Sequence, residues 1–517
     1  MTKQSNRRRF LTALGTGSLA VAAGCTDQLP GGGEANGNEN GATESEAVPE
    51  DENGDNGDAT PPAISHGELV SDFDEDIDEW FALNGEVESD DEVFLTGSQT
   101  VRIENSGEAA GIARSFADGL DIEGHHLSLA VRVDNPRPAR VTVRLLAPGQ
   151  ADQIWSTRTI LSPYEGWLRM DVGYTGQRGE PFFDDIQEVQ ITLEDPNASQ
   201  DEPDEDEEEP ADEPDDAEDE AAEDESGDAD GDDDGDAIDD TVEEMFEDND
   251  NLLSLEAKPF LQVENEDDSD DDNEEEADED NGEIQFWVDD LRMTPAADQG
   301  YVMLTFDDNV ESQYENAFPI FEERDMQGVL CVIPPTLNRP ERLDIDHLRE
   351  MRDAGWDISA HAERSDGLAD MDPEEAQEAL QSDHEYLDNR GFPDGARFHT
   401  VPYHNVNQEV VDIAREHYEM NSYFGGTPNA IPFTDPMHLS RVNMHDLDGF
   451  TSLIDTAEEH NQLAIGLAHG VVPEDEVEDD GLADMTTEQL EELLDYIEDS
   501  DVQLVTASDL IDNQDDL

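Results

Sequence analysis

Lysine is almost missing from this chain of 517 residues, in which only Lys3 and Lys258 occur, so nearly all its cations are arginines. Lys and Arg together number 25 against 138 Asp and Glu, a formal net charge of −113. Such a charge repels phosphates and argues against nucleic acid as a partner. It also expands a chain in dilute buffer, whereas in molar salt the Debye length falls to roughly 3 Å and screens the repulsion. We expect adaptation to high salt; a polymer that binds cations or basic proteins is the alternative.

Cysteine is scarce as well, and the two present, Cys25 and Cys331, exclude a disulfide framework. Cys331 lies in the apolar run 328–333 and is expected to be a buried strand residue. Long apolar runs are also missing, and the stretch that ends at Ala23 is too short and too weak to span a bilayer. Basic residues before this stretch and small residues after it are typical of an export signal.

Residues 1–25 resemble a twin-arginine lipoprotein signal, because residues 6–11 read NRRRFL and residues 21–25 read VAAGC, which is similar to a lipobox. The resemblance implies export of the folded protein, acylation of Cys25 and a lipid anchor at the outer face of the cell membrane. An ordinary signal with a chance cysteine is the alternative. Residues 26–65 have almost nothing to bury and are expected to form a disordered tether.

Residues 66–295 contain short runs that read as strands, for example 92–95 and 140–146, several with the apolar and polar alternation of half-buried antiparallel strands. Their spacing predicts a β-sandwich. Residues from about 200 to 282 are mostly acidic and are expected to be a disordered insertion in that sandwich. The reason is that residues 283–293, EIQFWVDDLRM, alternate like a strand and need partners from the chain before the insertion.

The opening and closing segments of this region, SDFDEDIDEWFALNG and FWVDDLRM, resemble jelly-roll modules of the carbohydrate-binding type. The resemblance implies sugar binding, with Trp80, Trp155 and Trp167 as candidates, although a tryptophan in a sandwich more often packs in the core. Asn197 begins a sequon beside the acidic insertion, where a glycan could be attached on an exported protein.

From residue 299 onward strands and helices alternate, which predicts an α/β fold with a parallel barrel or a doubly wound sheet. Residues 302–306 are an unbroken run of apolar or β-branched residues and read as a strand buried on both faces. Asp307 and Asp308 follow directly, at the carboxyl end of that strand. Parallel α/β folds place their chemistry at this end, so the two carboxylates mark the expected site.

Five motifs here resemble the polysaccharide deacetylase family, the NodB-homology fold of the carbohydrate esterases. They are TFDD at 305–308, His361 after GWDISA, the helix MDPEEAQEAL, Pro402-Tyr403 and LAH at 467–469. The resemblance implies a distorted (β/α) barrel over residues 299–517 that hydrolyses N- or O-acetyl groups of a polysaccharide. This reaction needs a nucleophilic water, a stabilised oxyanion and a proton for the leaving group.

Carried over by position, the resemblance implies that Asp307 is the base, that His469 is the acid and that the Tyr403 backbone N–H binds the oxyanion. It also implies a divalent metal held by Asp308 and His361, and these ligand types favour Zn²⁺. Each residue has a plainer reading when taken alone: a helix cap for the aspartates, a core position for His361 and a turn for His469. Their ordered occurrence in one βα series outweighs these readings.

Two positions depart from the family pattern. Ser365 stands where a second histidine ligand is expected, and a neutral hydroxyl is a poor substitute for imidazole. Thr400 stands where an arginine commonly orients the catalytic aspartate. Glu363, Asp366 or His404 could complete the metal shell.

Three functions remain open from the sequence. The motif residues favour a lipid-anchored, metal-dependent deacetylase, because a binding module needs no base and acid on separate strands. The two departures favour a catalytically impaired barrel that binds cell-surface polysaccharide. A third reading is an acidic surface component with a vestigial barrel. The expected partners are a polysaccharide and the membrane, without nucleic acid.

Overall fold

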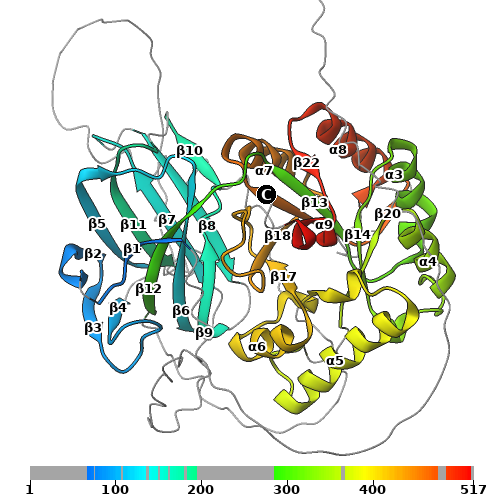
Figure 1. Ribbon diagram of the computed structural model, residues 1–517, viewed down its shortest axis with the longest axis horizontal. Coiled ribbons are helices and arrows are strands. Elements are labelled where there is room, and N and C mark those ends of the chain that lie inside the picture. Colours follow the sequence, from blue (N-terminus) through cyan, green and yellow to red (C-terminus); the bar gives the residue numbers. More distant parts are fainter. Residues whose placement is uncertain are drawn as a thin grey trace, which may run out of the picture. The chain divides into compact units, whose positions relative to one another are not determined.

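The structure is a computed structural model that describes residues 67–194 and 284–513, apart from gaps at 75, 106–108, 136–138, 150–151, 161–163, 180–182, 363–366 and 475–484. The predictions for the export signal, Cys25, the tether, the acidic insertion, Asn197 and Ser365 concern residues outside this part of the chain. The described residues form an antiparallel β-sandwich followed by a parallel barrel with helices around it (Figure 1). This confirms the predicted fold class.

Two antiparallel sheets make up the sandwich. One has the strand order β3-β4-β12-β6-β9, with β1 also paired to β12, and the other has the order β10-β8-β7-β11-β5-β2. The strands are β1 (Glu68–Ser71), β2 (Trp80–Asn84), β3 (Glu86–Asp90), β4 (Thr100–Asn105), β5 (Ala109–Leu120), β6 (His125–Asn135), β7 (Ala139–Leu146), β8 (Gln153–Ile160), β9 (Tyr164–Asp171), β10 (Gly176–Arg178), β11 (Ile186–Glu194) and β12 (Ile284–Pro295).

Strand β12, which follows the acidic insertion in the sequence, completes the first sheet. It lies between β4 and β6, with Phe286 opposite Ile103 of β4 and Val133 of β6. All three side chains are buried, so the alternating residues of β12 supply the sandwich core. The strand predicted at residues 283–293 therefore pairs with strands that precede Asp195, as expected.

Residues 92–95, by contrast, form a loop rather than the expected strand. The Asp289 carboxylate accepts hydrogen bonds from the backbone N–H groups of Leu95 and Thr96, at 2.8 and 3.0 Å. A carboxylate from β12 therefore satisfies backbone donors that a neighbouring strand would otherwise pair. The alternating sequence pattern does not reveal such a side-chain partner.

Two of the three tryptophans that were candidates for sugar contact are buried, Trp80 in the sandwich core and Trp167 in a separate cluster with Ala130 and Trp287. Trp80 and Trp167 are each only 5% exposed, and the Trp80 ring stacks on Phe73 with centroids 4.8 Å apart. The Trp80 indole N–H also donates to Ser71 Oγ at 3.0 Å. Both residues therefore serve packing, whereas Trp155 is only half-buried.

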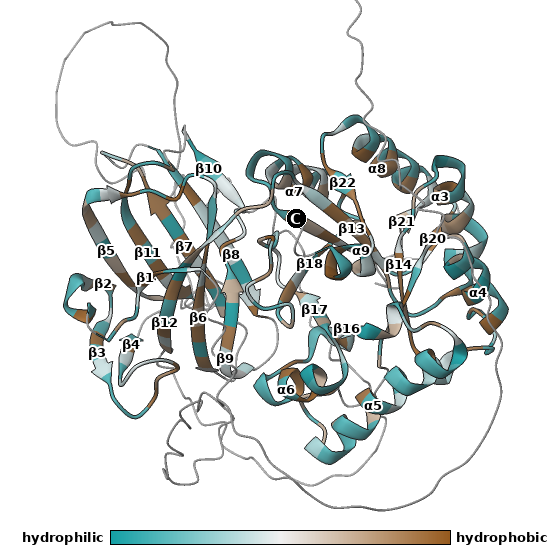
Figure 2. Ribbon diagram, in the orientation of Figure 1, coloured by the Kyte–Doolittle hydropathy of each residue, from teal (hydrophilic) through white to brown (hydrophobic). Residues whose placement is uncertain are grey.

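The barrel is closed in the described chain by seven parallel strands in the order β13-β14-β15-β16-β17-β18-β19, and β19 pairs with β13. Apolar residues concentrate along its strands, and all six residues of β13 are buried (Figure 2). The strands are β13 (Tyr301–Phe306), β14 (Val329–Val332), β15 (Asp357–Ala360), β16 (Phe398–Thr400), β17 (Met420–Phe424), β18 (Leu439–Asn443) and β19 (Leu463–Ala468), with β22 (Gln503–Leu504) paired to β13.

Helices follow the barrel strands, and their starts agree with local sequence signals. Asp372 caps the longest of them, its carboxylate accepting from the Glu374 N–H at 3.1 Å, and Pro373 occupies the first helical position. The helices are α3 (Phe318–Arg324), α4 (Ile345–Asp353), α5 (Pro373–Arg390), α6 (Gln408–His417), α7 (Leu447–His460), α8 (Thr487–Asp499) and α9 (Ala507–Asp512).

Residues 425–438, all of which are described, join β17 to β18 without a helix. The sandwich contacts the barrel there through Arg158 of β8, whose Nη2 donates to the His438 carbonyl at 2.8 Å. The Arg158 guanidinium also lies over the Tyr423 ring, 5.3 Å from its centroid, and the residue is only 2% exposed. The sandwich therefore covers barrel strands at a point where the chain provides no helix.

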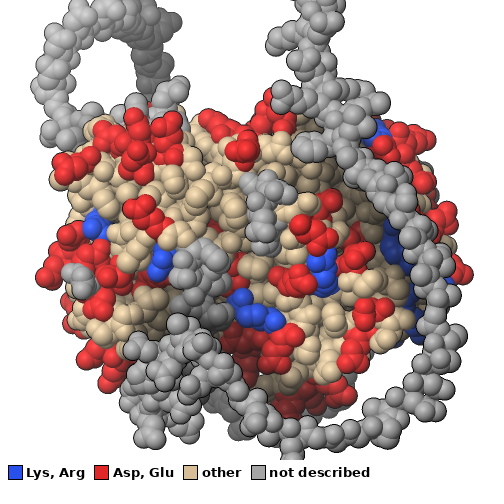
Figure 3. Space-filling view, in the orientation of Figure 1, with Lys and Arg blue, Asp and Glu red and all other residues tan. Residues whose placement is uncertain are grey.

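Acidic side chains are spread over the visible face of both the sandwich and the barrel, and few basic ones lie among them (Figure 3). None of the helices in the described ranges is long and apolar enough to cross a membrane.

Candidate active site

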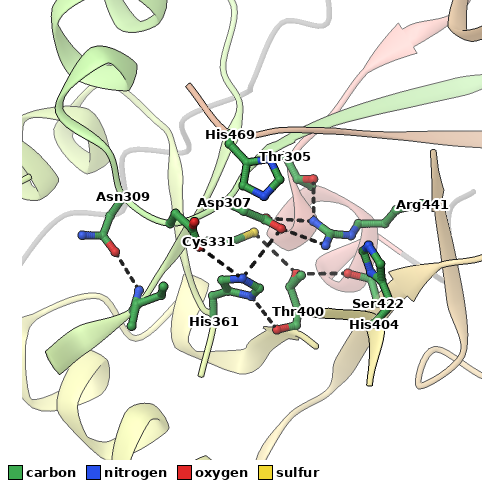
Figure 4. A network of polar contacts seen from close by, with 12 residues as sticks. Thr305, Asp307, Asn309, Cys331, His361, Thr400, His404, Ser422, Arg441 and His469 are labelled. Carbon is green, nitrogen blue, oxygen red and sulfur yellow. Dashed lines mark hydrogen bonds and ion pairs between the residues drawn. The ribbon is translucent and has the colours of Figure 1, made fainter. Parts of the chain in front are cut away.

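Four strand ends meet at one end of the barrel and carry the predicted site. Asp307 follows β13, His361 follows β15 and His469 follows β19, while Arg441 lies on β18 (Figure 4). Because the carboxyl ends of parallel strands share one edge, residues far apart in sequence come together here. The structure thus gathers the predicted base, a predicted metal ligand and the predicted acid.

Asp307 is buried and held in a bidentate ion pair with Arg441. Arg441 Nη1 donates to Asp307 Oδ1 and Nη2 to Oδ2, both at 2.9 Å, and Nη1 also donates to Thr305 Oγ1 at 3.1 Å. Burial would raise the pKa of the Asp307 carboxyl, but the Arg441 charge, with His361 and His469 nearby, holds that pKa well below its usual range. Asp307 is therefore ionised whenever the protein is folded near neutral pH.

The turn after β13 directs the two carboxylates differently. Asp308 and Asn309 both have left-handed backbone conformations, with φ of 74° and 44°. Asn tolerates this region better than most residues, and its Oδ1 accepts the Ile333 N–H at 2.8 Å. Strain of this kind persists only where surrounding bonds fix it, and here it places Asp308 beside His361.

His361 presents one nitrogen to the carboxylates. Its Nδ1 lies 2.9 Å from the Thr400 carbonyl oxygen, so Nδ1 carries a proton and donates it. Its Nε2 lies 3.5 Å from Asp308 Oδ1 and 3.8 Å from Asp307 Oδ2. In the neutral ring Nε2 and these oxygens all present lone pairs, so a cation between them would be bound from both sides.

Asp308 and His361 therefore have the chemistry and orientation of metal ligands, including the backbone bond that orients a ligating histidine. They supply only part of a shell. In residues 67–194 and 284–513, with the gaps noted above, no three His, Cys, Asp or Glu side chains are grouped so that they could hold a metal ion. Residues 363–366, which contain three of the positions considered for a further ligand, are not described.

His404 is oriented unfavourably for metal binding. Its Nδ1 accepts a hydrogen bond from the Phe424 N–H at 3.2 Å, so in the neutral ring the proton is on Nε2. Burial and the charge of Arg441 lower the pKa of His404 to about 3, which keeps the ring neutral. Neither nitrogen then offers a lone pair to a metal, so His404 does not complete the shell in this arrangement.

His469 lies above Asp307 in Figure 4 and His361 below it, so the predicted acid and the predicted ligand flank the base. His469 is tied to the base through the main chain, because Gln313 Nε2 bonds to the carbonyl oxygens of both Asp307 and His469. Tyr403 is in the turn after β16 with φ of 54°, and its side chain is 61% exposed. A Tyr403 contribution to the site would therefore come from its backbone.

Residues 294–419 match the polysaccharide deacetylase family. The C-terminal part of the chain therefore contains a polysaccharide deacetylase domain. A Bacillus subtilis protein named as a polysaccharide deacetylase, YxkH, is 23% identical over 115 residues, which are 22% of this chain and 41% of that protein. The chain thus matches less than half the length of this curated relative.

Two solved structures are similar to parts of this chain. The deacetylase PplD of Streptococcus pyogenes, solved with acetate, is 23% identical over 23% of this chain and 54% of its own, with a TM-score of 0.22. The peptidoglycan deacetylase PdaC of Bacillus subtilis is 16% identical over 42% of this chain and 93% of its own, with a TM-score of 0.29.

Sequence reasoning missed two buried residues of the deacetylase domain. Arg441 and Gln313 are both fully buried, and both bond directly to Asp307. A signal existed for Arg441, since it interrupts a run from His438 to Val442 that otherwise reads as a buried strand. An arginine at such a position must have a buried acidic or carbonyl partner. No comparable signal identified Gln313.

Proposed function

We propose that this protein is a metal-dependent polysaccharide deacetylase that hydrolyses N- or O-acetyl groups of an extracellular glycan. The observation that carries the proposal is the state of Asp307. It is a buried carboxylate, kept ionised by Arg441, with His361 and His469 on either side. A site that only binds glycan has no need to bury and compensate a charge in this way.

Each residue then has a defined task. Asp307 accepts the proton of the attacking water, since each of its oxygens keeps a lone-pair site besides the one used by Arg441. His469 donates a proton to the departing nitrogen or oxygen, and the Tyr403 backbone N–H stabilises the oxyanion. A divalent metal held by Asp308 and His361 would lower the pKa of the water and polarise the acetyl carbonyl.

The test is acetate release from chitooligosaccharides and from acetylated xylan by the full chain in multimolar salt, together with its metal content. We expect Asp307→Asn to lower the rate by at least about 10²-fold, as the loss of a general base does. Asp435→Asn is the matched control, because Asp435 is also buried and bidentate to an arginine, Arg415, on the outer side of the barrel. It should keep acetate release.

Bound glycan without hydrolysis is the second candidate, and the serine at position 365 favours it because a two-ligand site holds metal weakly. No bound metal and equal background acetate from wild type and Asp307→Asn would refute the deacetylase. Retained glycan binding in that case would support the second candidate.

We also propose that the chain is exported and anchored by a lipid on Cys25, in an organism that lives in high salt. The support is the NRRRFL segment, the VAAGC segment and the charge of −113. Replacement Cys25→Ser should move the protein from the membrane fraction to the medium while preserving acetate release. A variant that stays with the membrane would contradict the anchor.

A further inference from the structure

The buried Arg441 bears on the second departure from the family pattern, the threonine at position 400. On β16, Thr400 is buried, and its Oγ1 lies 3.1 Å from Ser422 Oγ and 3.4 Å from Cys331 Sγ, both neutral groups. A neutral hydroxyl cannot hold a carboxylate against the cost of burying it. Some other cation must therefore compensate the charge of Asp307.

That cation comes from a strand two positions further around the barrel. Thr400 of β16 pairs with Ser422 of β17, and Phe424 of β17 pairs with Arg441 of β18. Arg441 is fully buried, and its guanidinium meets Asp307 with two parallel bonds of 2.9 Å. Its backbone is fixed as well, because the N–H groups of Gly425 and Gly426 both donate to its carbonyl oxygen, at 3.2 and 3.3 Å.

We propose that Arg441 is the positioning residue for the base in this chain. It takes the role of the arginine expected at position 400, so Thr400 does not leave the base without an arginine partner. The two parallel bonds from the guanidinium fix both Asp307 oxygens, so the remaining lone pairs face the reacting water in one orientation. This inference rests on the proposed function, because a base needs positioning only if it takes a proton.

Three variants of the full chain test it by kcat and KM for acetate release. Arg441→Gln should lower kcat at least about 10²-fold and change KM little, because a misplaced carboxylate fails in the transition state while substrate binding is kept. The double variant Thr400→Arg with Arg441→Thr should recover at least about tenfold of that loss. Arg415→Gln, which breaks another bidentate pair, should keep the kcat of wild type.

A second readout separates this inference from the proposed function. A crystal structure of Arg441→Gln shows where the Asp307 carboxylate lies, with no turnover required. If wild type releases no acetate but the carboxylate leaves its place in Arg441→Gln and regains it in the relocated double variant, the proposed function fails and the positioning role stands. If Arg441→Gln keeps the kcat of wild type, or keeps the carboxylate in place, the inference is wrong. Should Arg441→Gln not fold, the relocated double variant decides: no recovery of activity or of the carboxylate position overturns the proposal.

Discussion

Breaking the Asp307–Arg441 pair from one side should cost more stability than its removal from both sides. The side chains are 3% and 0% exposed, so either single replacement leaves an uncompensated buried charge or dipole. Such breaks in other proteins cost about 3–5 kcal/mol, whereas neutral replacement of a whole buried pair costs much less. We therefore expect Asp307→Asn and Arg441→Gln to lose about 3–5 kcal/mol each. The double variant should lose less than either single variant, which makes the coupling at least about 3 kcal/mol.

The assay is equilibrium unfolding in urea at high salt, followed by tryptophan fluorescence. Trp356 is a suitable reporter because its ring lies 5.6 Å from that of Phe306, the last residue of β13. Salt gives an internal control, since surface ion pairs are screened at molar ionic strength and buried pairs much less so. The coupling should therefore persist when the salt is raised. If the losses in unfolding free energy of the two single variants add up in the double variant, the pair is not a buried, mutually dependent unit and the reasoning is refuted.

Three further measurements test other parts of the structure. His361→Gln should lower the metal content of the dialysed protein, whereas His404→Gln should leave it unchanged, because His404 Nδ1 already accepts the Phe424 N–H; equal loss from both variants would contradict the assignment. The pKa of Asp171, raised to about 6 by burial, implies a free energy of unfolding that falls as pH rises from about 4 to 7, by on the order of 3 kcal/mol. Asp171→Asn should flatten that slope in urea melts, and an unchanged slope would count against it. Trp80→Ala should cost about 3–5 kcal/mol of stability, since its ring packs in the sandwich core, and a weaker affinity for glycan without loss of stability would point to a sugar contact instead.

Sequence patterns were sufficient for the parts of the fold that depend on local periodicity. The apolar run before Asp307 predicts a buried strand, and the Asp372-Pro373 pair predicts a helix start; both are present. Residues 92–95 were wrongly predicted to be a strand. They form a loop, because their backbone donors are satisfied by Asp289, nearly two hundred residues away in the chain. Periodicity indicates whether a side chain faces the core or the solvent. It does not indicate which distant side chain bonds to the backbone of that residue.

The site follows the same division. Strand ends locate Asp307, Asp308, His361 and His469, because the carboxyl edge of a parallel sheet is readable from strand order. Arg441 could not be assigned to Asp307 from sequence, since a guanidinium can reach an aspartate from several neighbouring strands. His404 is a plausible metal ligand by residue type. The hydrogen bond that its Nδ1 accepts from the Phe424 N–H argues against that role.

The stretch without a helix between β17 and β18 limits how this chain could be divided. Arg158 and the neighbouring Thr159, whose N–H donates to the Gly425 carbonyl at 2.9 Å, would be removed from a protein that began at residue 296. Tyr423 and the His438 carbonyl, which Arg158 now covers, would then be exposed to water. We therefore expect the barrel to be less stable without the sandwich, which does the covering work of a helix at this point.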